Sequence, residues 1–538
     1  MADSLKDQMV AGFKVTSIAT LASRVLGMLR DMATGALFGL TAGGVLDALV
    51  VAFRIPNLFR RLFGEGALSA CYLPVLSREL ERDRDAAWQL ATATFAALSI
   101  VLLAAVLLGE AMIALLYRSY GDVAGLRLLL GLSATLLPYT IVICIAGQLA
   151  STLYAFMHFT IPALAPVVLN VVWIVAVLWI APAISDDKPT QAYVLAICIL
   201  AAGVLQMSMH LPPLWRRGYR FQLNWRQSRK SLTTIAAGLV PTLFGLAVTQ
   251  LNTLVDSMLA WGLARTPHSG AIITWLPGTI AYPVEQGAAA AVYYGERMYQ
   301  FPLGVLGATV ATVVFPLLAQ HAARGDQQRL ADDLTLGLRL VAFLAIPASA
   351  GLILLAQPIA LLLFQRGEFT VNDAQRSGTM IAWYASGVWA YCALPLLVRG
   401  FYCIDDHRSP VRLGLAAVGV NLLMNLTLIW SLGEIALALS TAVAAAVQVA
   451  GLILLFARRA GTLGATALWR THRQTFAATL LMSLACYALM QQFPSGETSS
   501  SRLLAVVIPS LASIGVYLVV AKILGSDELR LLLRRKRA

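Results

Sequence analysis

The chain has 538 residues, of which 59% are hydrophobic and only 12% are charged, and its formal net charge is +13. Soluble domains are about 45–50% apolar and about 25% charged, so this composition excludes an ordinary soluble fold and indicates that lipid is the solvent. Loops that set membrane orientation are typically rich in basic residues, which explains the positive net charge. This charge therefore does not indicate a nucleic-acid partner.

The N-terminal segment is not expected to be a cleaved signal peptide. Such a peptide needs a basic start and an uninterrupted apolar core. Here Asp3 and Asp7 offset Lys6, and Arg24 and Arg30 interrupt the first apolar stretch. We therefore expect this segment to form the first transmembrane span.

Stretches of mostly apolar residues recur along the whole chain. A span needs about 20 such residues, so they predict an all-α polytopic membrane protein with about fourteen transmembrane helices. The spans are expected near 11–38, 45–76, 88–117, 125–153, 161–182, 190–214, 232–263, 288–320, 334–356, 377–404, 411–432, 434–457, 473–492 and 502–524. The loops that then face the cytoplasm hold most of the basic residues, which predicts that both termini are cytoplasmic and that the tail is basic.

The first predicted span carries three charges where lipid is expected: Arg24, Arg30 and Asp31. Arg24 and Asp31 are seven residues apart and share a helix face, whereas Arg30 lies roughly 120° from Arg24. A charge at the bilayer centre costs about 2.5–3.5 kcal/mol, so these side chains must face a wet cavity or a partner. One aspartate cannot neutralise both arginines.

The second predicted span is charged as well. Asp47, Arg54 and Arg61 recur every seven residues, but Pro56 is expected to kink or break the helix, so the phase beyond it is unreliable. Arg61 and Glu65 are four residues apart and could pair with each other. Internal salt bridges and snorkelling ends are the alternative to a binding site for every charge in this region.

A further arginine, Arg297, lies near the start of the eighth predicted span. Arginines from several helices around one cavity would form a clamp for phosphate, because the guanidinium fork bonds two oxygens at once.

A weak internal repeat relates the two halves of the chain at a spacing of roughly 245 residues. Segments 67–74 and 308–316 each end in proline before a charged stretch. Segments 154–162 and 402–410 each run from tyrosine to proline, with an asparagine in the following span. The repeat joins spans one to six with spans seven to twelve, and parallel repeats around a central site are a transporter architecture.

A second candidate site uses oxygen ligands. Asp256 lies in the seventh span, Asn421 and Asn425 share one face of the eleventh, and Thr441 lies in the twelfth. Such hard ligands suit a small cation such as sodium, and interhelical hydrogen bonding is the alternative. The six cysteines include no CxxC pair, so neither a disulfide framework nor a zinc site is predicted.

Five motifs resemble the lipid II flippase family MurJ (MviN) of the MOP exporter superfamily. They are SRVLGMLRD at 23–31, AFRIPNLFRRLFGEGALS at 52–69, YYGERMYQFPLGVLG at 293–307, QRGEFTVNDA at 365–374 and GFYCIDDHRSP at 400–410. The resemblance implies a MATE-like fold with an N-lobe at 1–230, a C-lobe at 231–460, and two further helices with a basic cytoplasmic tail at 461–538. It also implies transport of an undecaprenyl-diphosphate-linked peptidoglycan precursor across the bacterial inner membrane, in cell-wall biogenesis.

The family's site residues carry over position by position. The cationic positions are Arg24, Arg30, Arg60 and Arg297, and the acidic positions are Asp31, Asp47 and Glu65. The resemblance favours Arg60 over the Arg61 of the seven-residue pattern. It also implies lipid II and membrane lipids as partners and no required cofactor. Some members bind sodium at positions like the oxygen ligands above. Contact with other cell-wall synthesis proteins is compatible with the resemblance.

The chain departs from the family pattern in three places. Gln300 stands where many members carry an acid, segment 264–288 is longer and rich in glycine and proline, and two residues are inserted before Asp47. None of these departures changes an arginine position.

Three other functions are compatible with parts of the sequence. An exporter of another polyprenyl-linked saccharide or of a drug would keep the fold, although the arginines disfavour a cationic drug. An enzyme acting on polyprenyl phosphates usually shows an acidic metal-binding cluster or a nucleophile with a base, and neither is present. A scaffold without transport would leave costly buried charges unexplained. No GxxxxGK[ST] loop is present, so transport without ATP is expected.

Overall fold

The structure is a computed structural model of the whole chain, and it describes residues 2–41, 43–64, 66–120, 124–266, 272–273 and 280–533. Its contacts divide the chain into two compact units. The first unit is Met1–Trp261 with Thr266–Gly270 and Arg366–Glu368, and the second is Gly262–Arg265, Ala271–Gln365 and Phe369–Ala538. The helix at 225–262, which the resemblance places in the C-lobe, is thereby grouped with the first unit.

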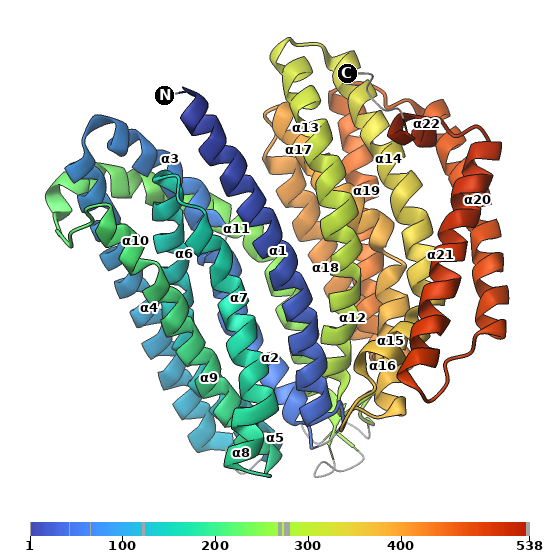
Figure 1. Cartoon of the computed structure of the whole chain (residues 1–538), viewed down its shortest axis with the longest axis horizontal. Coiled ribbons are helices and arrows are strands. Elements are labelled where there is room, and N and C mark those ends of the chain that lie inside the picture. Colours follow the sequence, from blue (N-terminus) through green and yellow to red (C-terminus); the bar gives the residue numbers. More distant parts are fainter. Residues whose placement is uncertain are drawn as a thin grey trace. The chain divides into compact units, whose positions relative to one another are not determined.

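The secondary-structure elements described in the first unit are all helices (Figure 1). Its elements are α1 (Ala2–Phe38), α2 (Val45–Phe59), η1 (Arg60–Gly64), α3 (Ala67–Arg82), α4 (Arg84–Tyr120), α5 (Ala124–Leu136), α6 (Tyr139–Ala155), α7 (Thr160–Val175), η2 (Ala176–Ile180), α8 (Ala181–Ile184), α9 (Lys188–Met209), α10 (Leu211–Arg216) and α11 (Trp225–Gly262). The η segments are π-helical turns, and they continue the preceding α-helices without a break.

Close helix packing in the first unit depends on small residues. Helix α1 packs along α7, and α9 packs against both α6 and α7. Gly203 of α9 faces the Tyr139 ring of α6 so closely that an added β-carbon would lie 2.7 Å from the ring. Small residues at such crossings allow helices to approach in lipid, where no hydrophobic force drives them together.

The second unit contains two short strands and the remaining helices. Its elements are β1 (Ala264–Arg265), β2 (Val284–Glu285), α12 (Ala288–Pro302), η3 (Leu303–Gly307), α13 (Ala308–Ala323), α14 (Gln327–Leu354), α15 (Ala356–Phe364), α16 (Val371–Ala385), α17 (Val388–Cys403), α18 (Arg408–Leu432), α19 (Ile435–Arg459), α20 (Ala465–Gln492), α21 (Ser499–Ile523) and α22 (Asp527–Leu533). Several helices begin at a polar cap: Asp326 accepts from the backbone N–H of Arg329, and Thr370 forms a capping box with Asp373.

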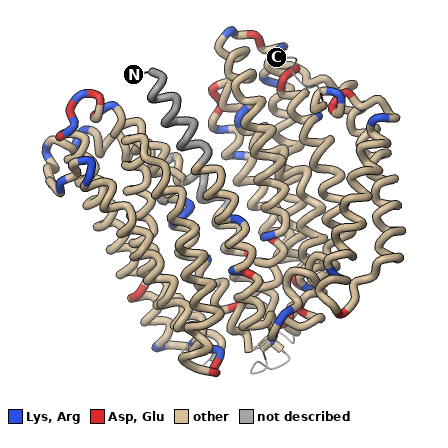
Figure 2. The backbone as a smooth tube through the Cα atoms, in the orientation of Figure 1, with Lys and Arg blue, Asp and Glu red and all other residues tan. Residues whose placement is uncertain are grey.

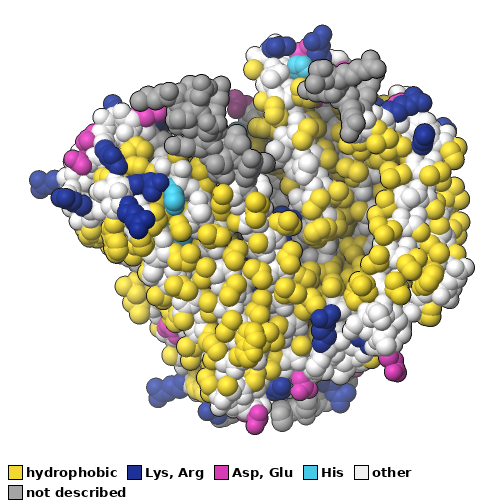
Figure 3. All heavy atoms as spheres, in the orientation of Figure 1, with side chains coloured by type: hydrophobic (Ala, Val, Ile, Leu, Met, Phe, Trp, Pro, Cys, Tyr) yellow, Lys and Arg dark blue, Asp and Glu magenta, His cyan; other side chains and the backbone are white. Residues whose placement is uncertain are grey.

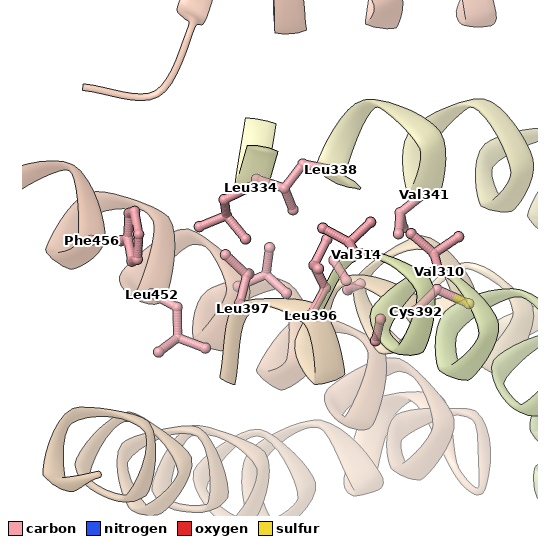
Figure 4. Packing of buried hydrophobic residues seen from close by; sticks show 14 of the residues in the cluster. Val310, Val314, Leu334, Leu338, Val341, Cys392, Leu396, Leu397, Leu452 and Phe456 are labelled. Atoms are coloured by element: carbon pink, nitrogen blue, oxygen red, sulfur yellow. The ribbon is translucent and has the colours of Figure 1, made fainter. Parts of the chain in front are cut away.

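The core of the second unit surrounds α17. Leu396 and Leu397 of α17 lie among side chains from α13, α14 and α19, including Val314, Leu334 and Phe456 (Figure 4). All five of these residues are buried. The pair α20–α21 is attached to this unit through α14, which packs along α20, and α15, which contacts α21.

All fourteen predicted spans fall on helix. Within the described residues, nine helices are long and apolar enough to cross a membrane, or ten when α16 and α17, bent by 43° at their junction, count as one span. The other four predicted spans lie on α1, on α2 to α3, on α11 and on α20, and they are more polar. The chain is therefore a multi-pass all-α membrane protein, and the count of fourteen remains a prediction.

Charge and hydrophobicity are distributed as a membrane requires. In Figure 2, most charged residues gather at the helix ends and connecting loops of each unit, and a smaller number lie along the helices. Figure 3 shows hydrophobic side chains covering the middle of the visible faces. Helix α4 is an example, because Leu108 is 72% exposed and Leu115 is 65% exposed. Lipid tails would cover such surfaces, as they would be unstable in water.

The internal repeat reappears as a matching turn in each unit. Met157 after α6 and Asp405 after α17 are the two non-glycine residues with positive φ in the described chain, at 53° and 60°. Each is the left-handed C′ residue of a Schellman motif, in which the N–H of His158 bonds to Leu153 O and that of Asp406 bonds to Phe401 O. Both turns fall inside the repeat segments 154–162 and 402–410. A π-helical turn also precedes α3 in one unit and α13 in the other.

The long segment at 264–288 contains strand structure that the sequence did not predict. β1 and β2 pair in parallel, with Ala264 opposite Val284, and an isolated bridge joins Ile272 to Ala281. Residues 267–271 and 274–279 lie outside the described part.

Candidate functional site

Arg24 stands apart from the other charges of α1. Its side chain is exposed in the middle of an otherwise largely apolar helix segment. Within the described part of the chain it makes neither a hydrogen bond nor an ion pair. Because a charge in lipid is costly, an exposed arginine here is suited to a wet surface and an anionic ligand.

Arg30, one helical turn and a half further on, has the opposite environment. It is 7% exposed. Its Nε and Nη2 donate to Oδ1 of the adjacent Asp31 at 3.0 and 2.7 Å, and its Nη1 donates to Oδ1 of Asn170 in α7 at 3.2 Å. Its guanidinium carbon lies 4.6 Å from the ring centroid of Trp173, also in α7. In this structure, therefore, Arg30 is paired within the unit.

The acidic positions are buried. Asp31 is 3% exposed and Asp47 is 2% exposed. Asp47 lies in the first turn of α2, which follows the left-handed residue Gly44. A carboxylate is stabilised there by the unpaired N–H groups and the dipole of the helix N-terminus. Glu65, the third acidic position, lies outside the described residues, as does its predicted pairing with Arg61.

Arg60 and Arg61 lie where the second predicted span changes from an α-helix to a π-helical turn. Pro56 lies within α2 and does not end the helix, and the π-helical η1, which begins four residues later, is what changes the seven-residue phase. Arg60 donates from Nε and Nη2 to Oδ1 of Asn57 at 3.1 and 2.9 Å. Arg61 donates to Oε1 of Gln250 in α11 at 3.0 Å. The two neighbouring arginines thus have different partners.

Arg297 belongs to the second unit. It lies on α12 with its guanidinium 5.6 Å from the ring centroid of Tyr293, one turn earlier. The neighbouring Glu296 is buried, and Gln300 is half-buried. Since Arg24, Arg30 and Arg60 belong to the first unit, the convergence of all four arginines on one cavity remains a prediction.

The candidate cation ligands fall into two groups. Asn421, Asn425 and Thr441 meet where α18 packs on α19. Asn421 donates to Thr441 Oγ1 at 3.1 Å, and Asn425 donates to Asn421 Oδ1 at 2.9 Å. Asp256 lies on α11, which is grouped with the first unit, and accepts from Asn252 at 3.3 Å. The three α18–α19 side chains fit the alternative of interhelical hydrogen bonding, and their oxygen atoms are of the hard type that a small cation prefers.

Two residues that sequence reasoning did not single out as part of the site contact Arg30. Asn170 entered the sequence argument only through the repeat, and Trp173 did not enter it. Both are 5% exposed. A polar asparagine within an apolar span is the one signal that could have identified this position, because buried amides in lipid need partners. The pairing of α1 with α7 is tertiary information that periodicity does not carry.

A family model described as "Lipid II flippase MurJ" matches residues 35–507. Among curated proteins, a probable lipid II flippase MurJ of Vibrio cholerae serotype O1 is 32% identical over 452 residues, covering 81% of this chain and 80% of the relative. A probable lipid II flippase MurJ of Rhizobium tropici is 29% identical over 543 residues, covering 98% of this chain and 97% of the relative.

Two solved structures are similar in fold. One is described as lipid II flippase MurJ in an inward closed conformation. It has a TM-score of 0.74 and 22% identity, and the match covers 96% of this chain and 99% of that one. The other is an inward-facing multidrug resistance MATE family transporter of the MOP superfamily, with a TM-score of 0.63 and 15% identity over 84% of this chain and 96% of that one. The predicted MATE-like fold is confirmed.

Proposed function

The chain belongs to the MurJ family of lipid II flippases, and we propose that it moves lipid II itself. The cargo would be the undecaprenyl-diphosphate-linked muropeptide, and the direction would be from the cytoplasmic to the periplasmic leaflet of the bacterial inner membrane. The names of the relatives, matched over 80% or more of their length, support this proposal over export of a drug or another saccharide.

The observation that carries the proposal is the state of Arg24. An exposed arginine within a span, without a hydrogen bond or ion pair inside the described part of the chain, is costly unless an anion or water faces it. A diphosphate is the part of lipid II that supplies such an anion. The guanidinium fork binds phosphate oxygens in pairs, so Arg24 would be the first contact of the head group.

Transport would proceed by alternating access. The arginines of the two units would hold the diphosphate in a hydrated cavity while the polyprenyl tail stays in lipid, and the units would then rock to open the other side. An inside-negative potential favours outward movement of an anion by about 2.3 kcal/mol per charge per 100 mV. The potential would therefore drive the cycle. No bond in the cargo is broken, so the protein would act as a transporter and not as an enzyme.

We propose the inner membrane with both termini in the cytoplasm. The charged segments 78–85 and 216–230, together with the end of the chain, would then be cytoplasmic and rich in arginine, as the bias of basic residues towards the cytoplasm requires.

The function is tested by reconstituting the full chain in vesicles that contain labelled lipid II. Exchange of the label between leaflets, with the lipid chemically unchanged, is the expected result. Formation of a new product would indicate an enzyme, and absence of exchange in a folded preparation would refute the proposal. Vesicles containing a labelled polyprenyl-linked saccharide without the peptide stem would test the alternative cargo.

A cellular test addresses the arginines. In a strain depleted of its own flippase, Arg24→Ala, Arg30→Ala and Arg297→Ala are each expected to abolish rescue while the protein remains in the membrane at its normal level. Arg118→Ala, at the exposed end of α4, is a matched loss of charge outside the candidate site and is expected to rescue. Full rescue by all three site variants would contradict the arginine clamp.

Sodium is proposed as a co-ion. The support is the cluster of Asn421, Asn425 and Thr441 between α18 and α19, together with the buried carboxylate of Asp256. Lipid II exchange would then fall when sodium is replaced by potassium or choline, and Asp256→Ala would remove this dependence. Sodium-independent exchange together with full activity of Asp256→Ala would contradict the proposal.

A further inference from the structure

Arg30 contacts two kinds of partner, one charged and the other neutral. Asp31 is a charged partner on the same helix, bonded at 2.7 Å. Asn170 and Trp173 are neutral partners on α7, one turn apart from each other. A charged partner cancels the guanidinium charge, whereas an amide oxygen and an aromatic face hold the group without changing its net charge.

The orientation of the Asn170 amide is determined by a second contact. Its Nδ2 donates to the backbone carbonyl of Ser23 in α1 at 3.0 Å. Because a carbonyl can only accept, the amide nitrogen must face Ser23 and the amide oxygen must face Arg30, where it accepts from Nη1 at 3.2 Å. Asn170 therefore joins α1 to α7 at two points and presents an acceptor to the arginine.

The ring of Trp173 is fixed on both sides. Its Nε1 donates to Thr34 Oγ1 at 3.0 Å, and Thr34 Oγ1 in turn donates to the backbone carbonyl of Arg30 at 2.7 Å. The Phe53 ring of α2 packs edge-on against it with the centroids 5.1 Å apart. The ring face is thus held beneath the guanidinium at 4.6 Å. A cation over a desolvated indole is stabilised by the negative face of the ring.

We propose that Asn170 and Trp173 are the positioning residues of the anion-binding arginine Arg30. When the diphosphate of the cargo arrives, it replaces the Asp31 carboxylate on the guanidinium, and the two α7 residues keep the group in place during this exchange. The proposal rests on the proposed function, since it concerns how the same cargo is held. It assigns to α7 a role in substrate affinity beyond helix packing.

Three substitutions at Asn170 and Trp173 distinguish positioning from packing. Asn170→Asp keeps the shape of the side chain and an acceptor against Arg30, but it loses the bond to the Ser23 carbonyl and cancels the charge that phosphate needs. Trp173→Phe keeps an aromatic face and loses only the bond to Thr34, whereas Trp173→Leu keeps the apolar bulk and loses the face. A purely structural role predicts that Asn170→Asp and Trp173→Leu change the melting temperature and leave the half-saturating density of lipid II unchanged.

The experiment measures initial rates of lipid II exchange in vesicles as the lipid II density is varied, with the melting temperature of each purified variant. Asn170→Asp and Trp173→Leu are expected to raise the half-saturating density by about tenfold, equivalent to about 1.4 kcal/mol of binding, while Trp173→Phe stays within about threefold. Trp179→Leu, on the exposed face of η2, is the matched loss of an indole and should leave the half-saturating density of lipid II unchanged.

The outcomes are separable. If the wild-type chain does not exchange lipid II, the proposed function fails. If the wild type is active and Asn170→Asp and Trp173→Leu keep the wild-type half-saturating density, the positioning role fails alone, even when their melting temperatures fall. Should Asn170→Asp not insert, Asn170→Ser removes the bond to Arg30 without adding charge and is expected to raise the half-saturating density by about threefold.

Discussion

Glu528 of α22 and Arg339 of α14 form an ion pair of 2.7 Å that is almost completely removed from water, since the Glu528 side chain is 1% exposed and that of Arg339 is 18% exposed. Thr471 of α20 donates to the same carboxylate oxygen at 2.6 Å. Through these bonds the C-terminal helix attaches α20 to the core helix α14. The sequence had indicated only a basic cytoplasmic tail in this region.

Removal of Arg339 is therefore expected to be costly. Arg339→Met leaves Glu528 buried without its cation, and breaking such a pair destabilises by about 3 kcal/mol. Thermal unfolding in detergent should show a clear fall in melting temperature. Asp527→Asn is the matched control, because Asp527 is 44% exposed and 3.6 Å from the same arginine, and exposed pairs contribute at most about 1 kcal/mol. Equal effects of the two substitutions would contradict the attachment role.

The same carboxylate makes stability depend on pH. Burial alone would raise the pKa of Glu528, but the hydrogen bonds from Thr471 and Ser526 and the charge of Arg339 outweigh burial and lower that pKa. The ionised form is thus favoured by folding. Its stabilisation is complete above the ordinary glutamate pKa of about 4.3 and is lost as the pH falls through the lowered pKa.

Melting temperatures measured from pH 7 down to pH 3 test this dependence. The wild type should lose stability on acidification, and Glu528→Gln should start lower and lose less. A parallel decline of both proteins would show that this carboxylate is not responsible.

The two Schellman turns predict an unusual gain from glycine. A left-handed backbone costs a non-glycine residue about 1–2 kcal/mol, and Met157 adopts it at φ 53°. Met157→Gly is expected to raise stability by about 0.5–1 kcal/mol after the extra entropy of unfolded glycine is subtracted. Asp405→Gly should gain less, because aspartate tolerates this conformation better. Met157→Ala keeps the strain, and a gain from alanine equal to that from glycine would contradict the argument.

Gly307 is predicted to be intolerant of any side chain. A β-carbon added there would lie 2.9 Å from the Cα of Cys392 in α17, so backbone would have to move. Gly307→Ala is expected to destabilise by about 1–3 kcal/mol. Gly351→Ala in α14, where an added β-carbon meets nothing within 4 Å, should instead stabilise by about 0.5–1 kcal/mol. Yields and melting temperatures of the two variants should move in opposite directions.

Much of the fold follows from the sequence because long apolar stretches in lipid have to be helical. The predicted spans fall on helix for this reason, and the repeat was visible because its turns are local. The pairing of β1 with β2 and the burial of Glu528 were not predicted. Both depend on contacts between distant segments, and a two-residue strand or a seven-residue helix has too short a pattern to be recognised.

The candidate site, like the fold, was predicted from the sequence only in part. Arg24, Arg30 and Arg297 were identified by charge in apolar surroundings and by motif. The partners that distinguish them were not predicted, because charge periodicity cannot show that Arg30 stacks on Trp173 while Arg24 is exposed. Spacing alone had placed Arg24 and Asp31 on one face, but the ion pair of Asp31 is formed with its neighbour Arg30.

The most direct measurement of the central claim is the initial rate of lipid II exchange between leaflets for the wild-type chain and for Arg24→Gln, at equal reconstitution and equal melting temperature. The account predicts rapid exchange by the wild type and at least about a tenfold slower rate for the variant at low lipid II density, since one charge-assisted contact to phosphate contributes about 1.5–3 kcal/mol. Equal rates for the two proteins, or no exchange by the folded wild type, would contradict it.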